Sequence, residues 1–173
     1  RAAGVTKGAF FHHFPSKEAL AIAAADHFGR TADGLFADAP FRAAPRAADR
    51  VLGYVALRAA LMQGPIESWT CYAGTLTQEV WASHPAIRQA AAAEILGHAA
   101  RLEPDFAEAL AEAGEDPAQA PGLSRHVQAV LQGAFVLAKA AGDPAPARES
   151  ADHLLRHLST RLRAEIPQIP SSA

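Results

Sequence analysis

Few residues of this chain have the types and spacing needed for covalent chemistry. Cys71 and His84 are the nearest pairing of a nucleophile with a base, but no motif around either residue would orient them. A lone cysteine is more often a small buried hydrophobic residue than a catalyst. The sequence also has no glycine-rich phosphate-binding loop. We therefore expect no enzyme activity and no cofactor.

Histidine pairs raise the separate question of a metal site. His12 and His13 are adjacent, so their side chains diverge on a helix and cannot share one ion. His153 and His157 are four residues apart, a spacing that suits chelation, but no third ligand is evident near them. We expect no bound metal.

The distribution of charge indicates contact with phosphate at one end of the chain. The net charge of the 173 residues is only −2. Residues 1–17 contain Arg1, Lys7 and Lys17 and no acidic residue, so the rest of the chain carries five more acidic than basic residues. A small basic end on an acidic body is typical of a protein that touches nucleic acid at one place.

The first residues have the pattern of the joint in a helix-turn-helix. A helix end meets a tight turn at Gly4, and Thr6 is a good N-cap for a short helix over residues 7–13. The small residues Gly8 and Ala9 would let the backbone of this helix approach the floor of a DNA groove closely. The pattern fits a recognition helix for double-stranded DNA, but it also fits a plain surface turn.

The run from Ala3 to Leu20 resembles the second half of the helix-turn-helix of tetracycline-repressor (TetR) type transcriptional regulators. The usual family form is alanine-glycine-valine, Ser or Thr, Lys, Gly, a small residue, an aromatic residue or Leu, Tyr, any residue, His or Tyr, and Phe, followed by a Lys-Glu-x-Leu helix start. Nearly every position fits. The sequence begins within this pattern, so we expect the first helix of the DNA-binding head to lie upstream of Arg1.

The resemblance implies which residues touch DNA. Thr6, Lys7, Gly8 and Ala9 match the positions that approach base edges in the family. His13 and Lys17 match the positions that hold backbone phosphates. Phe11 departs from the family, which usually has a Tyr there with its hydroxyl on a phosphate. A contact with a thymine methyl group or a sugar would replace it. The predicted DNA-binding residues are Thr6, Lys7, Gly8, Ala9, Phe11, His12, His13 and Lys17.

Composition predicts an all-α fold, because alanine is abundant and β-branched residues are sparse. We expect residues 1–20 to form the C-terminal part of the DNA-binding head and residues 21–165 to form a helical bundle for effector binding and dimerisation. Residues 166–173 are expected to be a flexible tail. The expected helices cover residues 7–13, 17–36, 46–63, 72–82, 85–113, 123–141 and 145–165.

Two features of the body lead to further expectations. Pro104 lies inside the expected helix over residues 85–113 and should kink or divide it. Residues 94–116 contain seven acidic residues against one arginine, which favours a solvated outer face.

The single cysteine rules out an internal disulfide and fits a reducing cytoplasm. No apolar run approaches the roughly 20 residues of a membrane-spanning helix.

The last two helices carry narrow apolar stripes at helical spacing. The resemblance implies that such helices pack against their copies as a four-helix homodimer interface. The same stripes would also fit two ordinary core helices. The residues predicted for the interface are Val127, Leu131, Ala134, Ala138, Leu154, Leu155, Leu158 and Leu162.

The resemblance also implies a pocket for a small-molecule effector among the central helices. Large apolar side chains are available there, with Gln78 or Thr75 as polar contacts, and they favour an apolar or aromatic effector. Aromatic residues at helical spacing are also common in an ordinary core. The predicted effector-binding residues are Tyr54, Met62, Trp69, Tyr72, Gln78, Trp81 and Phe135.

Two functions remain open at this point. The first is a regulator, by the family norm a repressor, that an effector releases from operator DNA. The second is a helical ligand-binding or dimeric interaction module that does not bind DNA. Selection of bound sequences from random DNA would separate them.

Overall fold

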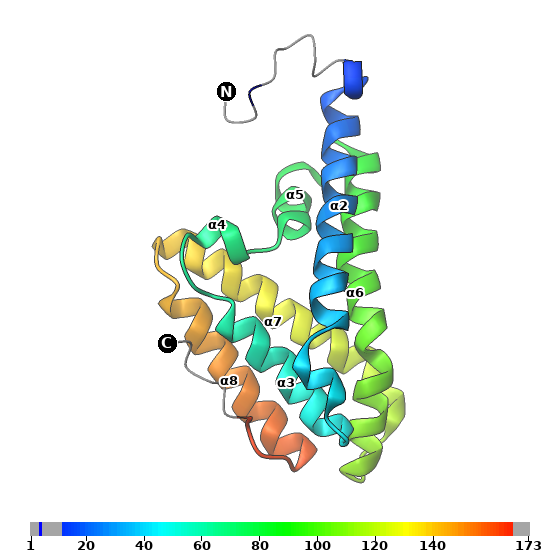
Figure 1. Cartoon of the computed structure of the whole chain (residues 1–173), viewed down its shortest axis with the longest axis vertical. Helices are drawn as coiled ribbons and strands as arrows, with labels where there is room; N and C mark the ends of the chain where they lie inside the picture. The colour runs from blue at the N-terminus through cyan, green and yellow to red at the C-terminus, as the bar shows by residue number, and fades with distance from the viewer. Residues whose placement is uncertain (1–3, 5–11, 168–173) are drawn as a thin grey trace.

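The computed structural model describes Gly4 and residues 12–167, and within them it contains helices and no strand (Figure 1). The all-α prediction is confirmed. The elements in chain order are α2 (Lys17–Ala37), η1 (Pro40–Ala43), α3 (Ala47–Ala60), α4 (Ile66–Trp69), α5 (Tyr72–Val80), α6 (Pro85–Glu112), η2 (Pro117–Gln119), α7 (Ala120–Ala141) and α8 (Ala145–Leu162).

Helix α6 is the element on which the bundle is assembled. It packs against α2, α3, α5 and α7, and α8 lies against α3 and α7. Figure 1 shows α2 running beside the first half of α6, with its N-terminal end above the rest of the bundle. The end of α2 that carries the predicted DNA contact Lys17 is therefore the end farthest from α3 and α8. No helix in the described part of the chain is long and apolar enough to cross a membrane.

Local signals in the sequence place most helix boundaries correctly. Ser16 caps α2, because its hydroxyl accepts a hydrogen bond from the backbone N–H of Ala19 at 3.0 Å. Gly142 ends α7 with a φ of 65°, a conformation that glycine adopts without strain. The sequence missed the short helices: η1 and α4 both lie between the helices that the sequence predicts.

Pro104 does not divide α6, which continues from Pro85 to Glu112. Proline removes one N–H from the helix ladder, but the residues on either side hold the helix to the core. Leu102 and Phe106 are both buried there. Tertiary packing therefore keeps the residues on both sides of Pro104 in one helix.

The acidic stretch is not a freely solvated face. Asp105 on α6 forms ion pairs with Arg42 at 2.6 Å and with Arg50 at 2.8 Å. The carboxylate of Glu112 accepts hydrogen bonds from the backbone N–H of Ala47 at 3.0 Å and from that of the next residue at 3.3 Å. These carboxylates fix η1 and the start of α3 against α6. None of the seven acidic residues of this stretch is buried, so the expectation of a solvated face holds in part. The sequence did not show the pairing, because the cationic and N–H partners come from distant parts of the chain.

Gly53 gives a test of the packing between α3 and η1. A methyl group added there would overlap the Cβ atom of Phe41, which cannot move without the η1 backbone. We expect Gly53→Ala to destabilise the fold by about 1–3 kcal/mol despite the higher helix propensity of alanine. Urea denaturation measures the change.

The matched control is Gly34→Ala, at an exposed position of α2 where no other atom lies within 4 Å of the added methyl group. It should stabilise the protein by up to about 1 kcal/mol through helix propensity alone. If both substitutions raise the urea midpoint, the packing described for Gly53 is incorrect.

Candidate functional site

The predicted DNA-binding residues divide into two groups. His12, His13 and Lys17 are exposed, and Lys17 is the first residue of α2. The rings of His12 and His13 lie edge to face, with their centroids 5.1 Å apart. The other five, Thr6, Lys7, Gly8, Ala9 and Phe11, lie outside the described residues.

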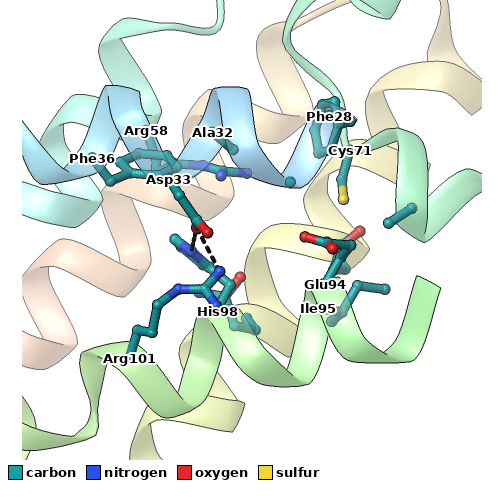
Figure 2. Close-up of a pocket in the computed structure, with 14 residues that line it drawn as sticks. Phe28, Ala32, Asp33, Phe36, Arg58, Cys71, Glu94, Ile95, His98 and Arg101 are labelled. Carbon is teal, nitrogen blue, oxygen red and sulfur yellow. Dashed lines mark hydrogen bonds and ion pairs between the residues drawn. The ribbon is translucent and has the colours of Figure 1, made fainter. Parts of the chain in front are cut away.

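A cavity lies inside the body between α2, α6 and α7, with further walls from α3 and the start of α5 (Figure 2). Its volume of about 40 Å³ is enough for only a few water molecules. A larger ligand must therefore move its walls. The residues that line the cavity are Phe28, Gly29, Ala32, Asp33, Phe36, Arg58, Cys71, Ala73, Glu94, Ile95, His98, Arg101, Gln128 and Gln132.

A buried hydrogen-bond network joins three helices beside this cavity. The amide Nε2 of Gln128 donates to the hydroxyl oxygen of Tyr54 at 2.8 Å, and this oxygen lies 2.9 Å from Nε2 of His98. Because the Tyr54 oxygen accepts from Gln128, its own proton points to His98. The ring nitrogen Nε2 of His98 is then an acceptor, and the network assigns the ring proton to Nδ1.

His98 is held in its neutral form. Burial, followed by the nearby Arg58, lowers the pKa of His98 to about 4. Asp33 is the acidic residue beside the ring, with its Oδ1 3.9 Å from Nδ1, but Arg101 donates to the same oxygen at 2.5 Å. Figure 2 shows both side chains converging on Asp33. The guanidinium of Arg101 offsets the charge of Asp33, so the Asp33 carboxylate does not keep the His98 imidazole protonated.

Two glycines make room for polar groups that line the cavity. A methyl group at Gly29 on α2 would overlap the carboxylate of Glu94, and one at Gly74 on α5 would overlap the amide oxygen of Gln132. Burial, followed by the nearby Asp33, raises the pKa of Glu94. The cavity thus presents an acid and an amide opposite an apolar wall. Glycines inside predicted helices are the sequence signal that could have indicated these residues.

None of the seven predicted effector residues lines this cavity. Tyr54, Met62 and Phe135 are buried in the core, and Tyr54 reaches the cavity only through His98 and Gln128. Trp69 packs on Phe135, with ring centroids 5.8 Å apart, and lines a neighbouring cavity. The remaining three lie on or next to α5: Tyr72 and Trp81 are exposed, and Gln78 bonds to its own helix.

The eight residues predicted for the dimer interface are buried within one chain, so they are not available to a partner copy. They are Val127, Leu131, Ala134, Ala138, Leu154, Leu155, Leu158 and Leu162, and none is more than 4 % exposed. Their stripes fill the core that α7 and α8 share with α3. The outward side of α7 instead exposes Val136 and Leu137.

The histidines of α7 and α8 lie on the surface. His126 and His157 face one another with ring centroids 6.3 Å apart, and His153 is exposed one turn before His157. Within Gly4 and residues 12–167, no group of three or more His, Cys, Asp or Glu side chains has an arrangement that could hold a metal ion.

Comparison with known families decides the identity of the chain. Residues 1–24 match the family model described as bacterial regulatory proteins, tetR family. Residues 48–153 match the model of the transcriptional regulator LmrA/YxaF-like C-terminal domain, which covers more than half of the chain. The chain belongs to the TetR family of transcriptional regulators. No curated protein and no solved structure matches it significantly.

The two matches divide this TetR-family chain at α2. The head model ends at residue 24, inside α2, and the C-terminal model begins at residue 48, inside α3. The cavity residues from Arg58 to Gln132 lie within the C-terminal match, whereas the wall from Phe28 to Phe36 lies between the two matches. Helix α2 therefore connects the DNA-binding head to the cavity.

The neutral state of His98 predicts how stability depends on pH. Its pKa is about 4 in the folded protein, against an ordinary value of 6.5. As the pH falls, the unfolded chain takes up this proton first, so the stability is full above about pH 6.5 and is lost as the pH falls toward 4. We expect His98 to reduce the free energy of unfolding by about 2 kcal/mol between about pH 7.5 and about pH 5.

Urea denaturation of His98→Gln at both pH values measures this contribution. The variant should be less stable at neutral pH, and its stability should depend less on pH. His27→Gln, at an exposed position of α2, is the control and should retain the wild-type dependence. Equal pH dependence in His98→Gln and the wild type would show that His98 is not held neutral by the fold.

Proposed function

We propose that this protein is a repressor that binds operator DNA and is released from it when a small, mainly apolar molecule enters the body. One observation carries the proposal: Lys17 begins α2, and the middle of the same helix forms the apolar wall of the cavity. A change in the cavity therefore acts on the helix that presents a DNA contact.

The size of the cavity supports a mechanism for release. A ligand shifts an equilibrium only if it prefers one of two conformations. The cavity of about 40 Å³ does not hold a small organic molecule as it stands. Ligand binding would favour a conformation in which α2 has moved away from α6 and α7. That movement would displace Lys17 together with the recognition helix.

We further propose that the protein acts as a homodimer through the outward faces of α7 and α8. Val136 and Leu137 are 40 % and 53 % exposed, and the positions around them on α7 are small, including Ala129, Gly133 and Ala140. An exposed apolar stripe with small neighbours suits close packing of a helix against a second copy. Two heads in a dimer would bind a short imperfect palindrome.

The DNA-binding proposal predicts a sequence preference and a strong dependence on salt. Full-length protein is used to select sequences from random DNA, and its affinity for the selected site should fall steeply as salt rises. Lys7→Ala should weaken binding to this site by about 1–3 kcal/mol if Lys7 reads a base. Lys17→Ala should weaken binding to all sequences alike and reduce the salt dependence.

Lys139→Ala is the control for these lysines, because Lys139 lies on α7 and bonds to Thr75. It should leave DNA affinity unchanged. Equal affinity for selected and random DNA would exclude a sequence-specific regulator and favour a ligand-binding module that does not bind DNA.

The dimer proposal predicts opposite results for exposed and buried leucines. Leu137→Glu should give a folded monomer, because the charge would be buried only in the dimer. Leu96→Glu on α6, where the leucine is 56 % exposed, is the matched control and should remain a dimer. Leu155→Glu should unfold the chain, because Leu155 is buried within it. Sedimentation and circular dichroism separate these outcomes, and a monomeric wild type would refute the proposal.

A further inference from the structure

A second cavity adjoins the first along α2 and lies between this helix, the end of α3 and α4. Its volume is about 240 Å³, which is large enough for a small organic ligand. No acidic residue lines it. The lining residues are Phe28, Thr31, Ala32, Leu35, Phe36, Arg58, Leu61, Ser68, Trp69 and Thr70.

Arg58 is the charged residue of this cavity. Its guanidinium lies over the rings of Phe36 at 5.4 Å and Phe135 at 5.1 Å, and Figure 2 shows it beside Phe36. It forms no hydrogen bond or ion pair with the residues that the structure describes, whereas Arg42, Arg50 and Arg101 all pair with carboxylates. Its N–H donors are therefore available to a ligand.

Trp69 supplies a second donor without a partner. Its Nε1 is buried and has no hydrogen bond within residues 12–167, an unfavourable state for an indole N–H. The ring of Trp69 packs on Phe135, the same ring that Arg58 covers, so the two side chains adjoin one aromatic ring. The hydroxyls of Thr31 and Ser68 already donate to carbonyls of their own segments, at 2.9 and 2.7 Å.

Guanidinium and indole groups donate hydrogen bonds and cannot accept them. We propose that this cavity binds an aromatic or aliphatic carboxylic acid as its anion, with the carboxylate on Arg58 and Trp69. The apolar part of the acid lies against Phe28, Leu35 and Leu61. Burying the ion is favourable only because the charge is matched and hydrogen-bonded. The first cavity is less suited to an anion, because Asp33 and Glu94 line it together with Arg58 and Arg101, and Arg101 already pairs with Asp33.

This inference rests on the proposed function in one respect: the bound acid is taken to be the effector. The two cavities share Phe28, Ala32, Phe36 and Arg58, so a ligand in the second cavity contacts the same face of α2 that closes the first. An acid that displaces Phe28 or Phe36 would therefore also move the wall on which the proposed release depends. Binding itself requires no DNA and is measured without it.

The test compares 4-phenylbutanoate with 4-phenylbutanol and 4-phenylbutylammonium, which share one apolar body and differ in charge. Trp81→Phe leaves Trp69 as the only tryptophan of a chain that has two, so its fluorescence reports on this cavity. We expect the carboxylate to change the emission and to bind at least about tenfold more tightly than the alcohol. The ammonium should bind more weakly still. An alcohol that binds as tightly as the carboxylate would overturn the proposal.

Variants locate the binding site by titration calorimetry. Arg58→Met keeps an apolar side chain over the aromatic rings and should weaken carboxylate binding at least about tenfold. Trp69→Phe keeps the ring and removes the donor, and it should also weaken binding. Arg156→Met, which removes an exposed arginine of α8 outside the cavity, should have no effect.

Circular dichroism confirms that each variant is folded. If Arg58→Met fails to fold, Trp69→Phe and the charge series on the wild type still decide the outcome. Absence of carboxylate binding, or binding that neither variant weakens, would overturn the proposal. If the protein binds the carboxylate but shows no preference for any DNA sequence, the proposed binding site stands and only the regulator function is refuted.

Discussion

The fold depends on satisfying one buried hydroxyl group. Tyr54 is 1 % exposed, and a buried polar group without a partner is strongly unfavourable. Its two partners, His98 and Gln128, come from α6 and α7. The two hydrogen bonds therefore hold α3, which carries Tyr54, against both helices. The same burial keeps His98 neutral. The hydrogen-bond partners of Tyr54, His98 and Gln128, thereby also become part of the lining of the adjoining cavity.

Helix α6 connects this core to the rest of the molecule. Its carboxylates hold η1 and the start of α3 through Arg42, Arg50 and the N-terminal N–H groups of α3. Its first half packs along α2, the helix that reaches the DNA-binding head (Figure 1). The second half is therefore fixed by ion pairs, whereas the first half adjoins both the cavity and the helix proposed to move. This division suits a regulator with a rigid body and an adjustable head.

The cavity residues illustrate the limit of the sequence analysis. Large aromatic residues were predicted to bind the effector, but Tyr54, Met62 and Phe135 fill the core. Half of the residues that line the first cavity are instead charged or polar, such as Asp33, Glu94 and Gln132, and their neighbours lie on other helices. The apolar stripes of α7 and α8 were predicted to form the dimer interface, but they are buried within the chain. Spacing alone does not show whether a face is covered within the chain or by a partner.

The sequence by itself determined the features that are local. Alanine-rich composition fixes the helical class, the Ser16 cap and Gly142 fix helix ends, and the residues from Ala3 to Leu20 indicate the family. Only the tertiary structure decided that α6 continues through Pro104, that the acidic stretch pairs with arginines of η1 and α3, and which charged groups remain unpaired beside a cavity. The physical reason is that capping and helix propensity act over a few residues, whereas burial and charge pairing depend on residues that only the folded chain brings together.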